Sequence, residues 1–229
     1  MTWRAVFAFV LAVMIAASIG MAVAAVERSP GWISHPGAAT ILREIWLSLV
    51  IYAGVIVVVV AHCGEEWDEE MRNAARFGSI AGALEAVNIV LENAAPRLMG
   101  RPSISITAMV VVFMLWALAG AQTARDLRHF RPGITAAVIS AGVCMVIAVT
   151  VGFALELFVA PPSPSYIQTW SEFQRSGWMD ARAFGIANTL YSGFTHLWIG
   201  PVIALVVGAL GSGIGMKIGG RSHQAPRRA

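Results

Sequence analysis

The chain has 229 residues, of which 57% are hydrophobic and only 13% are charged, whereas soluble domains average about 25% charged residues. This composition excludes an ordinary soluble domain and indicates a protein that folds in lipid. The net charge of +3 is not gathered into clusters of Lys and Arg interleaved with aromatic residues. We therefore attribute it to the basic loops that orient membrane proteins and expect no nucleic-acid partner.

Six segments are long and apolar enough to cross a bilayer as helices. About 20 helical residues cross the hydrocarbon core, and the uncharged runs 5–26 and 45–63 reach this length. The predicted fold class is an all-α integral membrane protein, with one transmembrane domain over residues 1–229. Its predicted spans are 3–26, 38–63, 77–94, 104–124, 133–159 and 190–218.

The first two spans each raise one question about their ends. The first resembles a cleaved signal sequence, because Arg4 precedes an apolar run that reaches Ala22-Val23-Ala24, a small-x-small pattern. The run is longer than the roughly 7–15 apolar residues of a signal, so we favour a retained span; cleavage would leave five spans. In the second span, Arg43 and Glu44 are expected at headgroup depth, where long side chains reach water.

The third span is the least apolar, and it begins after the acidic stretch 65–70. We expect this stretch to form the first turns of the same helix, because carboxylates near a helix N-terminus meet its dipole favourably. Glu85 lies nearest the middle of the span and is expected to face protein and not lipid.

The distribution of basic residues supports a third span that crosses. With six spans and a cytoplasmic N-terminus, ten of the 16 Lys and Arg residues lie inside and six outside. Omitting the third span would place both of the densest inner clusters outside, against the tendency of Lys and Arg to stay in the cytoplasm. Both termini are therefore predicted to be cytoplasmic. The inner residues are Arg4, Arg72, Arg76, Arg125, Arg128, Arg131, Lys217, Arg221, Arg227 and Arg228.

The chain after the fifth span contains the longest outer loop, 161–180. There Tyr166, Trp170 and Phe173 follow i, i+4, i+7 spacing, which suits a helix on the membrane surface. The apolar stretch 181–218 would reach about 57 Å as one helix at 1.5 Å per residue, against a core of about 30 Å. Gly200-Pro201 is expected to kink or break it, and the sequence leaves open one kinked helix or two.

Two rows of small residues at four-residue spacing predict close helix packing. The fifth span carries one row, which leads to Glu156 near the outer end. The last span carries the other. The rows are Ala136, Ser140, Cys144, Ala148 and Gly152, and then Gly211, Gly215 and Gly219.

Polar residues of three spans are predicted to converge in the outer half of the bundle. Residues at i, i+3, i+4 and i+7 share one helix face, which groups the polar residues of the third span and, separately, those of the last stretch. Ionised carboxylates are costly in hydrocarbon, so they face the interior, pair, or titrate. The candidate intramembrane polar site comprises Glu85, Asn88, Glu92, Glu156, Asn188, Ser192 and His196.

Two interpretations of this cluster remain open. Carboxylates and an imidazole could bind a divalent metal or relay protons. Alternatively, Glu92 pairs with Arg97 or Arg101, Glu156 meets water at its helix end, and His196 bonds to a neighbouring helix. Asn and Ser side chains commonly hold helices together in this way.

The sequence assigns no catalytic residue and no cofactor, because it contains no HExxH, GxSxG or GxxxxGK[ST] motif. We favour a structural, accessory or regulatory component of a bacterial inner membrane, with the lipid bilayer and other membrane subunits as expected partners. One alternative is a small carrier or ion or proton pathway that uses Glu85, Glu92, Glu156 and His196. A second is a membrane-embedded enzyme that uses the same residues.

Overall fold

The computed structural model describes residues 3–35, 37–61, 65–94 and 102–221, and these ranges contain helices but no strand. Six helices among them are long and apolar enough to span a membrane, which confirms the predicted all-helical class. The long helices are α1 (Trp3–Arg28), α2 (Ala38–Ala61), α3 (Glu65–Ala94), α5 (Pro102–Leu127), α6 (Phe130–Ala154) and α9 (Ala181–Arg221). Four short elements join them, namely η1 (Pro30–Trp32), η2 (Leu155–Val159), α7 (Pro164–Ile167) and α8 (Ser171–Ser176).

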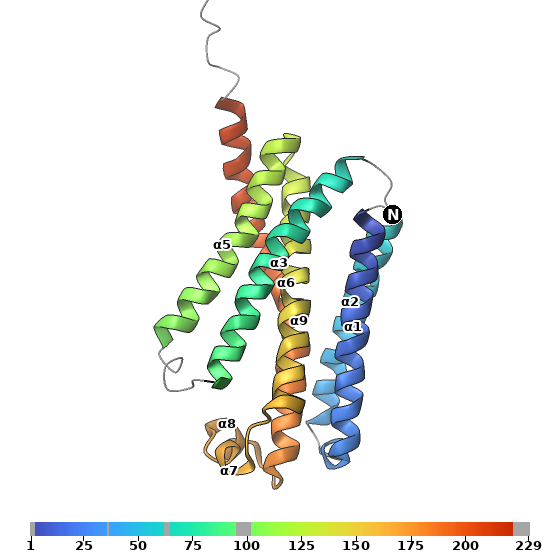
Figure 1. The fold of residues 1–229 in the computed structure, drawn as a ribbon, viewed down its shortest axis with the longest axis vertical. Helices are drawn as coiled ribbons and strands as arrows, with labels where there is room; N and C mark the ends of the chain where they lie inside the picture. The colour runs from blue at the N-terminus through green and yellow to red at the C-terminus, as the bar shows by residue number, and fades with distance from the viewer. Residues whose placement is uncertain (1–2, 36, 62–64, 95–101, 222–229) are drawn as a thin grey trace, which may run out of the picture.

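The long helices run alternately up and down, so their ends gather at two levels (Figure 1). We call the level that carries α7 and α8 the α7–α8 end. The opposite level, where α1 begins and α9 finishes, is the termini end. As predicted, the acidic stretch 65–70 belongs to the same helix as the third span, because α3 begins at Glu65.

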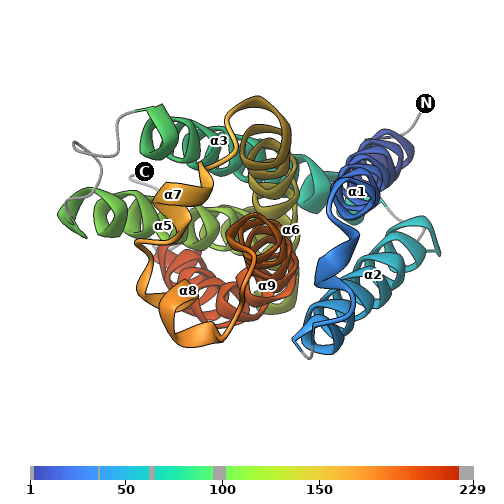
Figure 2. The same ribbon diagram turned by 90° about the horizontal axis from the view of Figure 1, so that it is seen from below.

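Helix α6 occupies the centre of the bundle. Half of its span is buried, against 22% for α1, α2 and α3. Viewed along the bundle from the α7–α8 end, α6 lies between α1 on one side and α3 and α5 on the other, and α9 packs against both α6 and α2 (Figure 2). The predicted small-residue row explains this position, because Ala136, Ser140 and Cys144 are fully buried and allow neighbouring backbones to approach.

Glycines bring α3 and α9 close to their neighbours. A Cβ at Gly78 of α3 would lie 2.6 Å from the Ser140 carbonyl oxygen of α6. The predicted packing role of Gly211 and Gly215 is also confirmed, since a Cβ at either position would collide with the backbone of α5. The first half of α5 diverges from α9 (Figure 1), and its side chains from 106 to 111 are largely exposed.

The 181–218 stretch is one helix and not two, and Pro201 lies inside it. Helix α9 begins at Ala181, ahead of the predicted start of the last span at 190. The earlier start has a local cause, because the Asp180 carboxylate accepts bonds from the amides of Arg182 and Ala183 at 2.8 and 3.1 Å. Such a cap satisfies amides that have no partner within the helix.

The loop 161–180 forms two short helices where one surface helix was expected. Trp170 has extended backbone angles and separates α7 from α8, so the three aromatic residues do not share a continuous helix face. Trp170 and Phe173 instead pack against Phe184 of α9 in edge-to-face geometry, whereas Tyr166 is 53% exposed.

Candidate functional site

Three of the predicted polar residues lie along one face of α3, and the charge of His196 on α9 acts on one of them, Glu85. The Asn88 amide donates to the Glu92 carboxylate at 3.3 Å, one helical turn away. Glu85 is half-buried and lies within electrostatic range of both Glu92 and His196. The Asn88 side chain is buried, and its Oδ1 atom has no hydrogen-bond partner among the described residues.

Ser192 and His196 of the predicted site contact each other within α9. His196 is exposed, and its Nδ1 lies 2.7 Å from the Ser192 carbonyl oxygen of the preceding turn. The Ser192 hydroxyl lies 3.4 Å from the same nitrogen. Asn188 is half-buried on this helix. Among the described residues, the imidazole therefore bonds within α9 and not to a neighbouring helix.

Glu156 lies apart from this group in its hydrogen bonding. It belongs to η2, a π-helical turn that is closed by the bond from the Ala160 amide to the Leu155 carbonyl at 2.8 Å. The Thr189 hydroxyl of α9 donates to the Glu156 carboxylate at 2.9 Å. The residues described as lining the pocket at Glu156 do not include Glu85, Glu92 or His196, so the predicted single site divides into two places.

Neither place has the ligands for a metal ion. Within the described residues, no three His, Cys, Asp or Glu side chains are grouped in a way that could hold one. The alternative in which Glu92 pairs with Arg97 or Arg101 concerns two arginines that lie outside the described residues.

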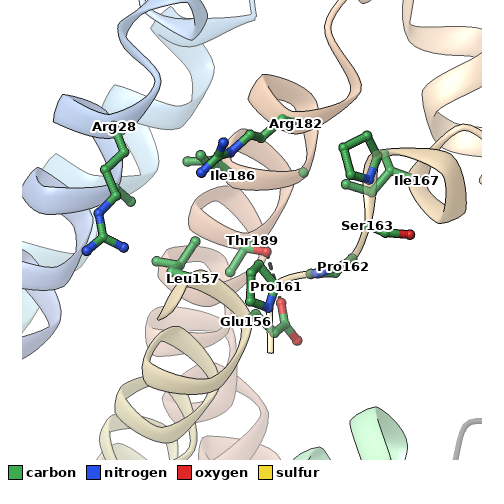
Figure 3. Close-up of a pocket in the computed structure, with 13 residues that line it drawn as sticks. Arg28, Glu156, Leu157, Pro161, Pro162, Ser163, Ile167, Arg182, Ile186 and Thr189 are labelled. Carbon is green, nitrogen blue, oxygen red and sulfur yellow. Dashed lines mark hydrogen bonds between the residues drawn. The ribbon is translucent and has the colours of Figure 1, made fainter. Parts of the chain in front are cut away.

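A pocket of about 200 Å³ surrounds Glu156 at the α7–α8 end. Figure 3 shows Arg28 of α1 and Arg182 of the first turn of α9 at the walls of this pocket, while the Glu156 carboxylate lies beside Thr189. Its apolar wall includes Leu157 and the residues Ala25, Ile167 and Ile186, and the proline-rich segment 161–164 lines it as well.

A second set of polar residues, on α2, had been missed in the sequence. Glu44, Ser48 and Tyr52 are buried, and all three bond to α9. The Trp198 indole donates to Glu44 at 2.8 Å, and the Ser48 hydroxyl donates to the Phe194 carbonyl at 2.6 Å. The Glu44 side chain was expected to reach water, but it is only 4% exposed, because α2 packs this face against α9. The four-residue spacing of these three residues was the available signal.

Tyr52 compensates for the proline inside α9. Pro201 has no amide hydrogen, so the carbonyl four residues earlier, that of Leu197, loses its helical donor. The Tyr52 hydroxyl lies 3.0 Å from the Leu197 oxygen and 3.3 Å from the Gly142 oxygen of α6. One side chain therefore joins α2, α6 and α9 at the point where α9 lacks a backbone hydrogen bond.

Over the residues that the structure describes, the fold and these contacts define an all-helical bundle with six helices long and apolar enough to span a membrane. Comparison with models of known protein families, with curated proteins and with solved structures gives no match.

Proposed function

We propose that the chain is an accessory or regulatory component of a membrane, in which buried polar groups hold the helices together and do not form a conduit. The observation that carries this proposal is that such groups bond to one another across helices. The Asn73 amide of α3 donates to the Thr123 hydroxyl of α5 at 3.1 Å, and the Ser18 and Thr150 hydroxyls of α1 and α6 lie 3.1 Å apart.

The arrangement of these bonds supports a rigid unit. Interhelical hydrogen bonds in membranes each contribute about 0.6 kcal/mol on average, and here they recur along several helix pairs. Together with the bonds from α2 to α9 near Pro201, they engage polar groups that a transport path would need to keep free. The exposed apolar side chains of α5, which include Ile106, Met109 and Met114, would then face lipid or another membrane subunit.

A flux measurement tests this proposal. The full chain is reconstituted in liposomes that contain a pH-sensitive dye, and a membrane potential is imposed with potassium and valinomycin. We expect proton entry at the rate of protein-free liposomes, and the same rate for the Glu85→Gln variant. Proton entry well above that rate in the wild type, and its loss in Glu85→Gln, would contradict the accessory role.

A small proton or ion pathway is the second candidate, and one observation favours it. Glu85 lies within electrostatic range of Glu92 and His196, and the buried Asn88 Oδ1 atom nearby lacks a partner among the described residues. Buried polar groups without partners are rare and call for an explanation. In the flux measurement above, this candidate predicts proton entry well above the rate of protein-free liposomes, and its loss in Glu85→Gln.

We further propose that both termini are cytoplasmic, in a bacterial inner membrane. The support is the excess of Lys and Arg at the termini end, because basic residues concentrate in cytoplasmic segments. We expect that a reporter enzyme that functions in the cytoplasm is active when it is fused after Arg228, and that a reporter that requires export is inactive there. Activity of a reporter that requires export, fused at the same position, would reverse this orientation.

A further inference from the structure

The pocket around Glu156 contains charges that are not paired with one another. Arg28, Arg182 and Glu156 come from α1, α9 and η2, and no ion pair joins these three side chains in the described structure. The Arg28 guanidinium lies 4.6 Å from the centre of the Phe158 ring, a cation–π distance that restrains the side chain. Glu156 is half-buried and accepts one hydrogen bond, from Thr189.

The positive charge of the pocket comes from these side chains and not from the backbone of α9. The carboxylate of Asp180 already accepts bonds from the amides of Arg182 and Ala183. Two guanidinium groups and one carboxylate therefore leave the pocket with an excess of one positive charge. A ligand with both a negative and a positive group would complement all three side chains.

The pocket lies where three candidate spans end. The span of α1 finishes at Arg28, that of α6 with η2 finishes at Val159, and that of α9 begins at Ala181. In a bilayer this level corresponds to the lipid headgroups. Aromatic residues are enriched at this depth. Trp178, in the loop between α8 and α9, is stacked on His35 with ring centres 3.8 Å apart.

We propose that this pocket binds a zwitterionic phosphoethanolamine group, with its phosphate on Arg28 and Arg182 and its ammonium on Glu156. The planar guanidinium fork matches phosphate oxygens in a bidentate way, and a carboxylate is the natural partner of a primary ammonium. The volume of about 200 Å³ is below the roughly 300–1,000 Å³ of pockets for drug-sized ligands. It suits a headgroup, whereas acyl chains would remain outside in the bilayer.

The test uses the full chain in detergent micelles and follows thermal unfolding while a ligand is added. A ligand that binds only the folded state raises the unfolding midpoint by mass action. Dioleoyl phosphatidylethanolamine is compared with dioleoyl phosphatidylglycerol, which carries the phosphate but no ammonium. Soluble glycerophosphoethanolamine distinguishes the source: equal affinity points to a free metabolite, and tighter binding of the diacyl form points to a membrane lipid.

Single variants test the proposed phosphate-binding arginines and the proposed ammonium-binding carboxylate separately. Arg28→Gln and Arg182→Gln are each expected to weaken phosphatidylethanolamine binding about tenfold, the factor that corresponds to one good polar contact. Arg175→Gln is the matched control, because Arg175 is exposed on α8 and does not line the pocket. Glu156→Gln is expected to weaken phosphatidylethanolamine binding and to strengthen phosphatidylglycerol binding, because it removes a negative charge.

The expected pattern is tighter binding of phosphatidylethanolamine than of phosphatidylglycerol by the wild type, with the two Arg variants impaired and the Arg175 control unchanged. Equal or tighter binding of phosphatidylglycerol by the wild type would overturn the proposal. So would an absence of binding by both ethanolamine ligands, or an equal loss in Arg175→Gln. The comparison of the two lipids uses the wild type alone and therefore decides the matter even if a variant fails to fold.

Discussion

Alanine at Gly211 or at Gly215 is expected to destabilise the bundle by about 1–3 kcal/mol, the usual cost of extra atoms in a packed core. A Cβ at Gly211 would collide with the Ala117 carbonyl oxygen of α5, and one at Gly215 would collide with that of Ala121. Both obstacles are backbone atoms, so a change of side-chain rotamer cannot relieve them. Helix α5 would have to move away from α9, and the close contact between the two helices would be lost. Such van der Waals packing is a main source of helix association in lipid.

Gly213 provides a matched control in the same helix, because a Cβ there meets no atom within 4 Å. Alanine is favoured over glycine in a helix by about 0.8–1.0 kcal/mol, so Gly213→Ala should leave the stability unchanged or raise it. Equilibrium unfolding in mixed micelles with increasing dodecyl sulfate, followed by tryptophan fluorescence, measures all three variants. If Gly211→Ala and Gly215→Ala were as stable as Gly213→Ala, the close contact of α5 with α9 would be refuted.

Replacing Tyr52 by phenylalanine is expected to cost about 1–2 kcal/mol of unfolding free energy. The change removes the hydroxyl that donates to the Leu197 carbonyl and leaves that buried oxygen without a donor. A buried polar group without a partner costs about 1–3 kcal/mol, although measured interhelical bonds in membranes reach only about 1.7 kcal/mol. Tyr166→Phe is the control, because Tyr166 is exposed on α7, and it should have no measurable effect.

A double-mutant cycle with Pro201 tests the reason for this loss. In Pro201→Ala, residue 201 regains an amide hydrogen that can bond to the Leu197 carbonyl, so the hydroxyl of Tyr52 becomes less important. Tyr52→Phe should then cost less in the Pro201→Ala background than in the wild type, with a coupling of at least about 0.5 kcal/mol. Strict additivity would show that Tyr52 does not compensate for the proline.

The candidate site could be predicted only in part. The helical period placed Glu85, Asn88 and Glu92 on one face of α3, where the Asn88 amide bonds to Glu92 and the charges of Glu92 and His196 act on Glu85. The same reasoning expected Glu156 to join them, but Glu156 bonds to Thr189, two helical turns before His196 in α9. Spacing within a helix fixes which residues share a face, but the packing of the helices decides which residues along that face meet a given neighbour.

The residues of α2 show that the sequence also failed to predict some contacts between helices. Glu44 was interpreted as a headgroup residue because it lies near the start of an apolar run. Its burial depends on the Trp198 indole, which is far away in the chain and reaches Glu44 only because α2 packs beside the middle of α9. Likewise, Arg28 and Arg182 are far apart in the sequence, so the sequence gave no indication that they line one pocket.

The sequence by itself determined the helical class, the six apolar segments, and the small-residue faces of α6 and α9. These features follow from local composition and the helical period, because a backbone in lipid must satisfy its hydrogen bonds within each helix. Only the tertiary structure decided that α9 is one helix through Pro201, that Tyr52 caps the carbonyl this proline leaves open, and that Glu156 lies with two arginines. Those outcomes depend on contacts between distant segments, whose register and rotation are set by packing of the whole bundle and not by any single segment.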